Sequence, residues 1–471
     1  MAPCPNEAEI RARMAADGVP ALVVAAFLQN VRRWSAGELG AIPGAVLAPL
    51  GRLPRLEELD ELDSAGEAAI ARTVLIKLNG GLGTSMGLDR AKSLIVAKNG
   101  LTFLDVVVRQ VEFLRRRCRA PLPLLLMNSF STETDSMAAM AERHPGFANP
   151  GGLPLSFCQH RVPKLAAATG APVRWPDNPA LEWCPPGHAD IYHALQTTGL
   201  LDRLLELGFR HAFVSNSDNL GALLHMGILA HVASRRLPFL MEVTARTECD
   251  RKGGHLARDR ATGRLLLRES AQCPADETAD FQDVRKYALF NTNNLWLDLE
   301  ALRDMLAGCG GLPELPLIVN RKTVDPVRAD SPAVVQLEAA MGAAISCFEN
   351  AAALVVPRSR FAPVKTTNDL LAIRSDLYTL GAEHQVALHP LRFAPPPDIL
   401  LDPRFYKNIA DFEERFAQGA PSLLQCESLR IDGDIHFGAG VRIEGAVHLR
   451  NPTAGPARIP DGIRLHTPAT A

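Results

Sequence analysis

The chain has 471 residues, with 50 Lys and Arg against 52 Asp and Glu, and it is 47% hydrophobic and 22% charged. At about 150 residues per domain, this length predicts two to four domains of an ordinary globular protein. The formal charge of −2 argues against a general nucleic-acid binder, which needs a basic surface, so any phosphate binding has to be local.

Cysteine usage and hydropathy point to the cytoplasm. The nine cysteines are scattered and form no C-x-x-C pair, which predicts free thiols in a reducing compartment. The apolar stretch from Val19 to Leu28 is about half the roughly 20 residues of a membrane helix, and acidic residues precede it, unlike in a secretory signal. We therefore expect a cytoplasmic protein with neither a membrane nor a nucleic acid as partner.

The first 70 residues show a helical pattern. Apolar residues such as Ile10 and Met14 recur at intervals of three to four, and Gly40, Pro43 and Pro54 interrupt the pattern. We expect residues 1–70 to form a helical N-terminal region.

Short β-branched and leucine-rich runs then alternate with helical patterns, which predicts an α/β fold with a mixed, mostly parallel sheet in residues 71–390. The predicted strands are Thr73–Leu78, Leu122–Met127, His211–Ser215, Pro238–Thr244 and Leu289–Leu297, and the predicted helices include Phe103–Arg117 and Leu220–Arg235.

The C-terminal segment has a period of six. Its aliphatic positions are Leu429, Ile435, Val441 and Val447 in one register and Ile431, Phe437, Ile443 and Leu449 in another. A coil of short strands would turn both registers inward, so we expect residues 391–471 to contain a linker, a helix and a parallel β-helix. The alternative is an ordinary β-meander.

A glycine-rich segment follows the first predicted strand directly, with Gly80, Gly81, Gly83 and Gly87 after Leu78. Glycines let backbone N–H groups approach a phosphate closely, and Lys92 could fold back onto it. The spacing matches neither a P-loop nor the dinucleotide fingerprint. A tight strand-to-helix turn without a ligand is the competing interpretation.

This segment, Leu-Asn-Gly-Gly-Leu-Gly-Thr-Ser-Met-Gly followed by Ala-Lys-Ser, resembles the signature of the eukaryotic-type UTP–glucose-1-phosphate uridylyltransferases, or UDP-glucose pyrophosphorylases. Six further blocks resemble that family in its order, at residues 126–130, 185–192, 214–221, 290–296, 336–344 and 356–367. The resemblance implies a Rossmann-like nucleotidyltransferase core and a C-terminal left-handed parallel β-helix. It leaves the oligomeric state open.

The resemblance also implies a reaction and a site. The partners are UTP, glucose 1-phosphate, UDP-glucose and pyrophosphate, the cofactor is Mg²⁺, and the protein supplies positioning and charge neutralisation. The implied catalytic residues are Lys92 and Lys365, and the implied metal ligand is Asp218. The implied nucleotide-binding residues are Leu78, Asn79, Gly80, Gly81, Gln159, Gly187, Asn216, Ser217 and Asp218. The implied sugar-phosphate contacts are His188, Glu269, Asn291, Asn293 and Asn294.

Several of these residues have structural alternatives. Asp218 could form a turn after a strand, and Lys365 could precede a helix cap. A zinc pair of His188 and His193 has the wrong spacing for one helix face. Ser217 and Ala189 depart slightly from the family pattern, which bears on the fine sugar preference.

Three other functions compete with UDP-glucose synthesis. A related pyrophosphorylase acting on other sugar or N-acetylhexosamine phosphates usually has alanine in place of Asn79. A non-catalytic nucleotide-sugar sensor would not need Lys92 and Lys365. A dinucleotide-dependent oxidoreductase would need a different glycine spacing.

Overall fold

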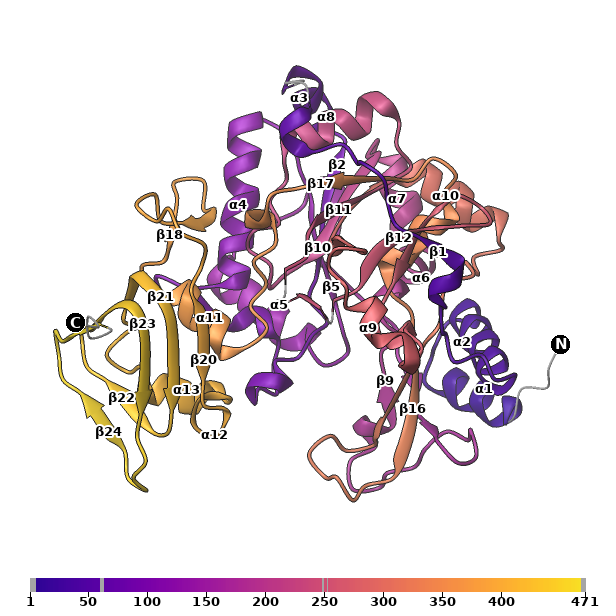
Figure 1. The fold of residues 1–471 in the computed structure, drawn as a ribbon. Helices are drawn as coiled ribbons and strands as arrows, with labels where there is room; N and C mark the ends of the chain where they lie inside the picture. The colour runs from indigo at the N-terminus through magenta and orange to yellow at the C-terminus, as the bar shows by residue number, and fades with distance from the viewer. Residues whose placement is uncertain (1–5, 60–62, 248–249, 252, 467–471) are drawn as a thin grey trace.

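The computed structural model describes residues 6–59, 63–247, 250–251 and 253–466, and its centre is a ten-stranded sheet (Figure 1). The strands of this sheet are β1 (Leu47–Ala48), β2 (Thr73–Leu78), β5 (Leu124–Asn128), β6 (Ser156–Cys158), β10 (His211–Asn216), β11 (Phe239–Ala245), β12 (His255–Asp259), β13 (Leu265–Arg268), β14 (Leu289–Asp298) and β17 (Ala352–Val355). The five predicted strands are therefore confirmed, with β2 at the predicted bounds.

The sheet is mixed, and most of its central strands are parallel. Strands β6, β5, β2 and β10 pair in parallel in that order. Strand β14 runs antiparallel to both β10 and β11, and β17 is parallel to β11. Strand β2 is buried from Thr73 to Lys77, as expected for a parallel strand covered on both faces.

Helices cover both faces of the sheet (Figure 1). They are α3 (Asp63–Ile70), α4 (Phe103–Cys118), α5 (Glu133–Arg143) and α8 (Met226–Arg235) on one face and α6 (Ile191–Thr197), α7 (Leu200–Glu206) and α10 (Leu299–Gly308) on the other. Leu75 packs with the first group, and Val74 and Ile76 pack with the second. This alternation along β2 follows from the two-residue period of a strand.

The N-terminal region is only partly helical. Helices α1 (Glu7–Ala16) and α2 (Ala21–Ser35) pack on a lobe built from β7 (Val162–Pro163), β8 (Leu165–Ala166), β9 (Trp183–Cys184), β15 (Ile318–Thr323) and β16 (Ala333–Glu338). Between α2 and α3, however, the chain is largely an extended strap. Its β1 pairs with β12, and Val355 N donates to Pro54 O at 2.9 Å. The prediction of a helical segment was wrong here because the Gly and Pro residues break the helix.

The C-terminal strands pair in parallel, so the meander interpretation was wrong. One sheet has the order β20 (Asp398–Leu401), β21 (Ser422–Asp432), β23 (Arg442–Arg450) and β25 (Arg464–His466), and β22 (Ile435–Phe437) pairs with β24 (Ala457–Ile459). Leu429 lies opposite Val447, three hexapeptides further along the chain. The side chains from Leu429 to Ile443 in the two predicted registers are buried.

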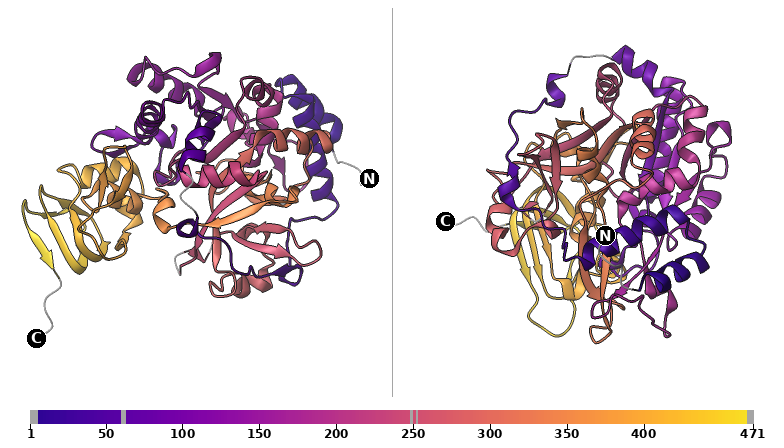
Figure 2. Two further views of the ribbon diagram at one scale, coloured as in Figure 1. Left: turned by 90° about the horizontal axis from the view of Figure 1, so that it is seen from above. Right: turned by 90° about the vertical axis from the view of Figure 1, so that its right-hand side faces the viewer.

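The C-terminal strands lie to one side of the central sheet, and helices α1 and α2 lie on the other side (Figures 1 and 2). The remaining elements are the hairpins β3 (Val96–Lys98) with β4 (Leu101–Thr102) and β18 (Tyr378–Leu380) with β19 (Val386–Leu388), and helices α9 (Thr278–Phe281), α11 (Thr367–Arg374), α12 (Pro403–Tyr406) and α13 (Ile409–Arg415). Tyr406, Phe412 and Leu423 share one apolar cluster with Phe103 of α4, so the C-terminal part packs on the core.

Within the described ranges, no helix has the length and apolarity to cross a membrane. The seven cysteines in these ranges are unpaired.

A buried ion pair fastens the N-terminal helices to the lobe. The Arg13 guanidinium contacts the Glu182 carboxylate, donates to Val173 O at 2.7 Å and lies over the Trp183 ring.

Arg13→Met should lower the free energy of unfolding by about 3–5 kcal/mol, because it leaves Glu182 buried without its cation. Urea unfolding would measure this loss. Adding Glu182→Gln should recover part of it, and equal losses in the single and double variants would contradict the assignment.

Candidate active site

The glycine-rich segment folds into a closed loop after β2. Lys92 N donates to Gly81 O at 3.2 Å, and Leu82 forms a bridge with Ala91. The backbone of Lys92 therefore returns to the start of the loop. A Cβ on Gly81 would meet no atom of the described residues within 4 Å, so the loop is open at this position.

The other residues of the loop entrance are packed against protein. A Cβ on Gly80 would lie 2.5 Å from Gln159 Nε2, so only glycine lets the Gln159 side chain lie there. Asn79 is buried, and its amide donates to Asn128 Oδ1 at 2.7 Å and to Ser136 Oγ at 2.9 Å. The structure thus brings Gln159 to the glycine-rich loop and turns the Asn79 side chain into the protein.

Asp218 lies beside Lys92 at the end of β10. Asn216 is paired with Leu78 of β2, and Ser217 N donates to Leu78 O at 3.0 Å, which joins the two loops. Lys92 Nζ lies 2.6 Å from Asp218 Oδ2. The other carboxylate oxygen, Oδ1, is buried and has no hydrogen-bond partner among the described residues. The position at the carboxyl ends of parallel strands is where open α/β sheets bind ligands.

The backbone beside Lys365 runs against the Asp218 loop. Val364 N donates to Asp218 O at 3.2 Å, and Asn219 forms an antiparallel bridge with Pro363. Lys365 is exposed, with its ammonium 5.8 Å from the centre of the Phe361 ring. Thr366 caps α11 through Asp369, so Lys365 does precede a helix cap while lying next to Asp218 in the fold.

Gly187 and His188 follow β9 and contact the segment after β16. Gly187 has φ +88°, and a Cβ there would lie 2.4 Å from Ala339 O, so both conformation and space require glycine. His188 Nδ1 accepts the Met341 N–H at 2.9 Å. Burial lowers the pKa of His188 to about 4, so the neutral ring carries its proton on Nε2.

The asparagine block forms a bulge in β14. The register against β11 shifts between Met241 and Val243, and Asn293 has φ +59°. Such bulges often lie near active sites, where they redirect a side chain. Asn291 Nδ2 donates to Asn293 Oδ1 at 2.8 Å, whereas the Asn294 side chain is fully buried and donates to Glu242 Oε2 at 3.0 Å.

Glu269 links this bulge to Lys365. Its carboxylate packs against Gly254, where a Cβ would lie 2.4 Å from Oε2, and Gly254 O accepts from Asn291 N at 3.3 Å. Burial raises the pKa of Glu269, and the Lys365 ammonium opposes this rise. The segments that carry Leu78, Lys92, Asp218 and Lys365 are therefore in direct contact, and Glu269 lies beside the bulge that carries Asn291.

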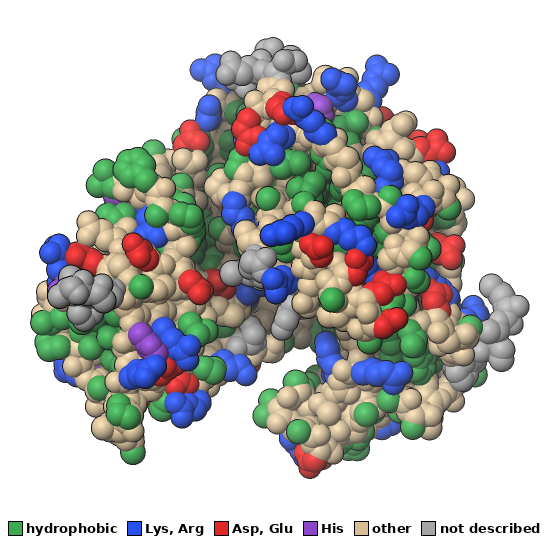
Figure 3. Space-filling model, viewed as in Figure 1, with side chains coloured by type: hydrophobic (Ala, Val, Ile, Leu, Met, Phe, Trp, Pro, Cys, Tyr) green, Lys and Arg blue, Asp and Glu red, His purple; other side chains and the backbone are tan. Residues whose placement is uncertain are grey.

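The segments of this group lead into two projecting parts of the molecule. Gly187 lies at the base of the lobe that contains β9 and β16, and Lys365 leads into α11, which contributes to the apolar cluster of the C-terminal part. Between these parts the surface is deeply hollowed (Figure 3).

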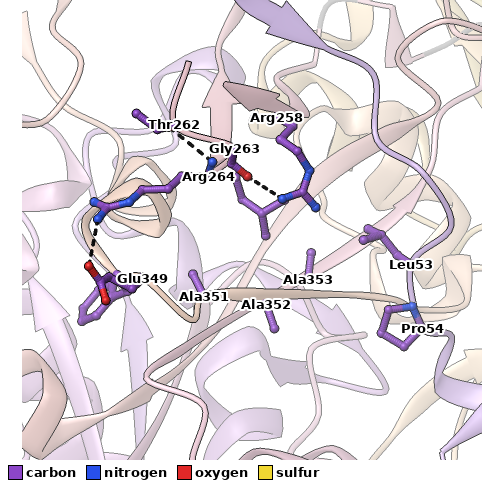
Figure 4. Close-up of a pocket in the computed structure, with 12 residues that line it drawn as sticks. Leu53, Pro54, Arg258, Thr262, Gly263, Arg264, Glu349, Ala351, Ala352 and Ala353 are labelled. Carbon is purple, nitrogen blue, oxygen red and sulfur yellow. Dashed lines mark hydrogen bonds and ion pairs between the residues drawn. The ribbon is translucent and has the colours of Figure 1, made fainter. Parts of the chain in front are cut away.

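Another pocket lies away from the predicted residues, between the β12–β13 hairpin, β17 and the strap (Figure 4). Arg258 donates to Gly263 O, and Arg264 lies 3.3 Å from the exposed Glu349 carboxylate. The residues that line this pocket include none of the predicted site residues, so it is not the candidate active site.

Comparison with known proteins decides the family. A sequence model of the UTP–glucose-1-phosphate uridylyltransferase family matches residues 46–444. The chain belongs to this family. The potato enzyme of that name is 42% identical over 83% of this chain and 79% of its own length, and the yeast enzyme is 40% identical over 83% and 77%. A mutant UDP-glucose pyrophosphorylase from Leishmania major, solved in complex with UDP-glucose, is 42% identical with a TM-score of 0.91, covering 98% of both chains.

Sequence reasoning missed four buried residues of this uridylyltransferase family member that support the site. They are Lys77, Asn219, Glu242 and Arg360. A charged residue inside an apolar strand was a usable signal for Lys77 and Glu242, because such residues are buried only when paired. Asn219 and Arg360 lie in blocks that the resemblance already included, but nothing in those blocks showed that they contact each other.

The buried His188 should make stability depend on pH. Between the ordinary histidine pKa near 6.5 and the folded value of about 4, the unfolded chain binds a proton that the folded chain does not, so stability falls as pH is lowered through this interval. His188→Gln keeps an acceptor for Met341 N–H. When the pH is lowered from 7 to 4.5, this variant should lose about 2 kcal/mol less of its free energy of unfolding than the parent protein loses. Urea unfolding at several pH values tests this, and parallel curves for both proteins would contradict it.

Proposed function

We propose that this chain transfers the uridylyl group of UTP to glucose 1-phosphate, forming UDP-glucose and pyrophosphate. The observation that carries the proposal is the family match over residues 46–444, together with relatives of that name at about 40% identity. The connected group of Gly81, Lys92, Asp218 and Lys365 supports it, because these residues are the ones that phosphate transfer requires.

The nucleotide-binding residues are proposed to be Leu78, Asn79, Gly80, Gly81, Gln159, Gly187, Asn216, Ser217 and Asp218. Gly81 is the open position of the loop, and the Gln159 amide beside Gly80 has the donor and acceptor that uracil requires. Asn79 acts through its backbone, since both of its amide hydrogens are bonded within the protein.

The sugar phosphate is proposed to contact His188, Glu269, Asn291 and Asn293. Neutral His188 offers an Nε2–H donor, and Glu269 and the bulge offer acceptors and donors for hydroxyl groups. Asn294 is withdrawn from this set, because its side chain is fully buried and bonded to Glu242.

The proposed reaction needs no enzyme nucleophile. A phosphate oxygen of glucose 1-phosphate attacks the α-phosphorus of UTP in line, and the bond to the leaving pyrophosphate breaks. Lys92 and Lys365 neutralise the phosphate charge and hold the two reactants in position. A site that works by positioning is consistent with the few titratable groups gathered here.

The residues present fit a Mg²⁺ ion. Asp218 Oδ1 is buried without a hydrogen-bond partner among the described residues, which is where a cation ligand is expected. The described residues contain no cluster of three or more His, Cys, Asp or Glu side chains that could hold a metal alone, which agrees with the preference of Mg²⁺ for one or two carboxylates plus phosphate oxygens and water. Bound there, Mg²⁺ would neutralise phosphate charge.

Three further assignments remain proposals. We propose the division into residues 1–70, 71–390 and 391–471, a left-handed parallel β-helix at the C-terminus, and a cytoplasmic location. The parallel pairing of β21 with β23 at a separation of three hexapeptides supports the β-helix.

The deciding assay mixes the full chain with UTP, Mg²⁺ and glucose 1-phosphate and measures UDP-glucose and pyrophosphate. Turnover is expected to be higher with glucose 1-phosphate than with the galactose or N-acetylglucosamine phosphates. A preference for one of the latter would assign a related pyrophosphorylase. Nucleotide-sugar binding without turnover would assign a sensor, and either result would overturn the proposal.

Gly81 and Gly80 form a matched pair for testing the nucleotide loop. Gly81→Ala should leave the thermal midpoint unchanged, because its Cβ meets no described atom within 4 Å, but it should weaken UTP binding at least tenfold, about 1.4 kcal/mol. Gly80→Ala should lower the midpoint, since its Cβ would displace Gln159. Calorimetric titration with UTP and thermal unfolding measure the two effects. Unchanged UTP affinity in Gly81→Ala would show that the loop is only a turn.

Lys365→Ala should lower turnover more than tenfold, an effect above about 1.4 kcal/mol, because it removes a phosphate cation without disturbing the core. Lys286→Ala is the control, since Lys286 is an exposed lysine paired with Asp280 at the surface. Steady-state kinetics of both variants measure the difference. Equal rates in the two variants would assign Lys365 a structural role.

A further inference from the structure

A buried ion pair joins Glu242 and Arg360. Glu242 of β11 accepts from Arg360 Nε at 2.7 Å and Nη2 at 2.6 Å, from Trp296 Nε1 at 2.9 Å and from Asn294 Nδ2 at 3.0 Å. Each carboxylate oxygen thus accepts two hydrogen bonds. Apolar residues of similar volume often stabilise a core as well as such a pair does, so the pair is not explained by stability alone.

Arg360 also forms hydrogen bonds with the loop that carries Asp218. Its Nη2 donates to Leu223 O at 2.8 Å, and its own carbonyl oxygen accepts from Asn219 Nδ2 at 3.1 Å. The two backbones are also in direct contact, since a Cβ on Gly221 would lie 2.3 Å from Ser359 O. Arg360 therefore fixes this loop at points on both sides of Gly221.

Asn219 joins the same loop to the segment that carries Lys365. Its Oδ1 accepts from Gly221 N at 3.2 Å and from Ala362 N at 3.0 Å, and it is 2% exposed. Asn219 is adjacent to Asp218 in the sequence, and Ala362 lies three residues before Lys365. One amide side chain therefore sets the spacing of the two backbones.

Lys77 of β2 also binds the loop that carries Asp218. Its buried Nζ donates to Ser215 Oγ at 2.7 Å and to Ala222 O at 3.1 Å. Lys77 immediately precedes Leu78 and the glycine-rich loop. The consecutive carbonyl groups of Ala222 and Leu223 thus accept hydrogen bonds from two buried side chains, Lys77 and Arg360.

We propose that Arg360, oriented by Glu242 and linked through Asn219, is a positioning residue that sets the separation of the Asp218 carboxylate from the Lys365 ammonium. This inference rests on the proposed function, in which those two groups bind the phosphates and the metal. Arg360 touches no reacting group itself and acts through the backbone of the two segments. A flat guanidinium is required, because a lysine could not bind both Glu242 oxygens and Leu223 O in this arrangement.

The test is a double-mutant cycle on turnover. Arg360→Lys alone should lower kcat at least tenfold, with a smaller change in KM for UTP. In a Lys365→Ala background it should lower kcat less than threefold further, because the position of an absent ammonium no longer matters. Asn219→Ala should behave in the same way. If Arg360→Lys does not fold, the same cycle is measured with Asn219→Ala instead.

Arg13→Lys is the matched control, since the Arg13–Glu182 pair is similarly buried but fastens the N-terminal helices. Thermal unfolding of all variants should show losses of stability like that of Arg13→Lys, which should keep nearly full kcat. The inference is overturned if Arg360→Lys or Asn219→Ala lowers kcat by the same factor with and without Lys365→Ala. It is also overturned if the loss of kcat in each variant equals the loss of folded protein. If the parent chain makes no UDP-glucose, the proposed function itself fails.

Discussion

The backbone contact between the loop after β10 and the segment before α11 is the constraint on which the candidate site depends. These segments are about 140 residues apart in sequence, yet the Asn219–Pro363 bridge and the hydrogen bond from Val364 N to Asp218 O place Asp218 and Lys365 side by side. The buried Glu242–Arg360 pair adjoins this contact, since Arg360 O accepts from Asn219 Nδ2 at 3.1 Å. Without the contact, a carboxylate and an ammonium would remain on separate surface loops.

The electrostatics of the site follow from this local arrangement. The whole chain is nearly neutral, with a formal charge of −2. Positive charge is instead gathered by folding, as Lys92 returns to Gly81 and Lys365 is fixed beside Asp218. Partial burial strengthens such interactions relative to water, which is how a few cations suffice for a highly charged substrate.

Elements set by a local apolar pattern were predicted from the sequence, and elements set by pairing with distant segments were not. Strands such as β2 and β10 were predicted to within a residue, because a strand buried on both faces needs a largely apolar run. The strap before α3 was not predicted, since its Gly and Pro residues indicate only that the helical pattern is interrupted, and its extended path is held by pairing with β12 and by contacts near Val355. The bulge at Asn293 could not be predicted from the sequence either, because a bulge is a shift in the register of β14 against its neighbour β11.

The sequence by itself determined five strands of the central sheet, the glycine-rich segment and the hexapeptide registers, since these are properties of local pattern, whereas the candidate site residues came from the resemblance to the uridylyltransferase family. The tertiary structure decided which of those residues meet, that Asn294 belongs to the core, and that Lys77, Asn219, Glu242 and Arg360 support the site. The reason is physical, because hydrogen bonds between segments far apart in sequence depend on how the sheet and its loops pack, and no local pattern encodes that packing.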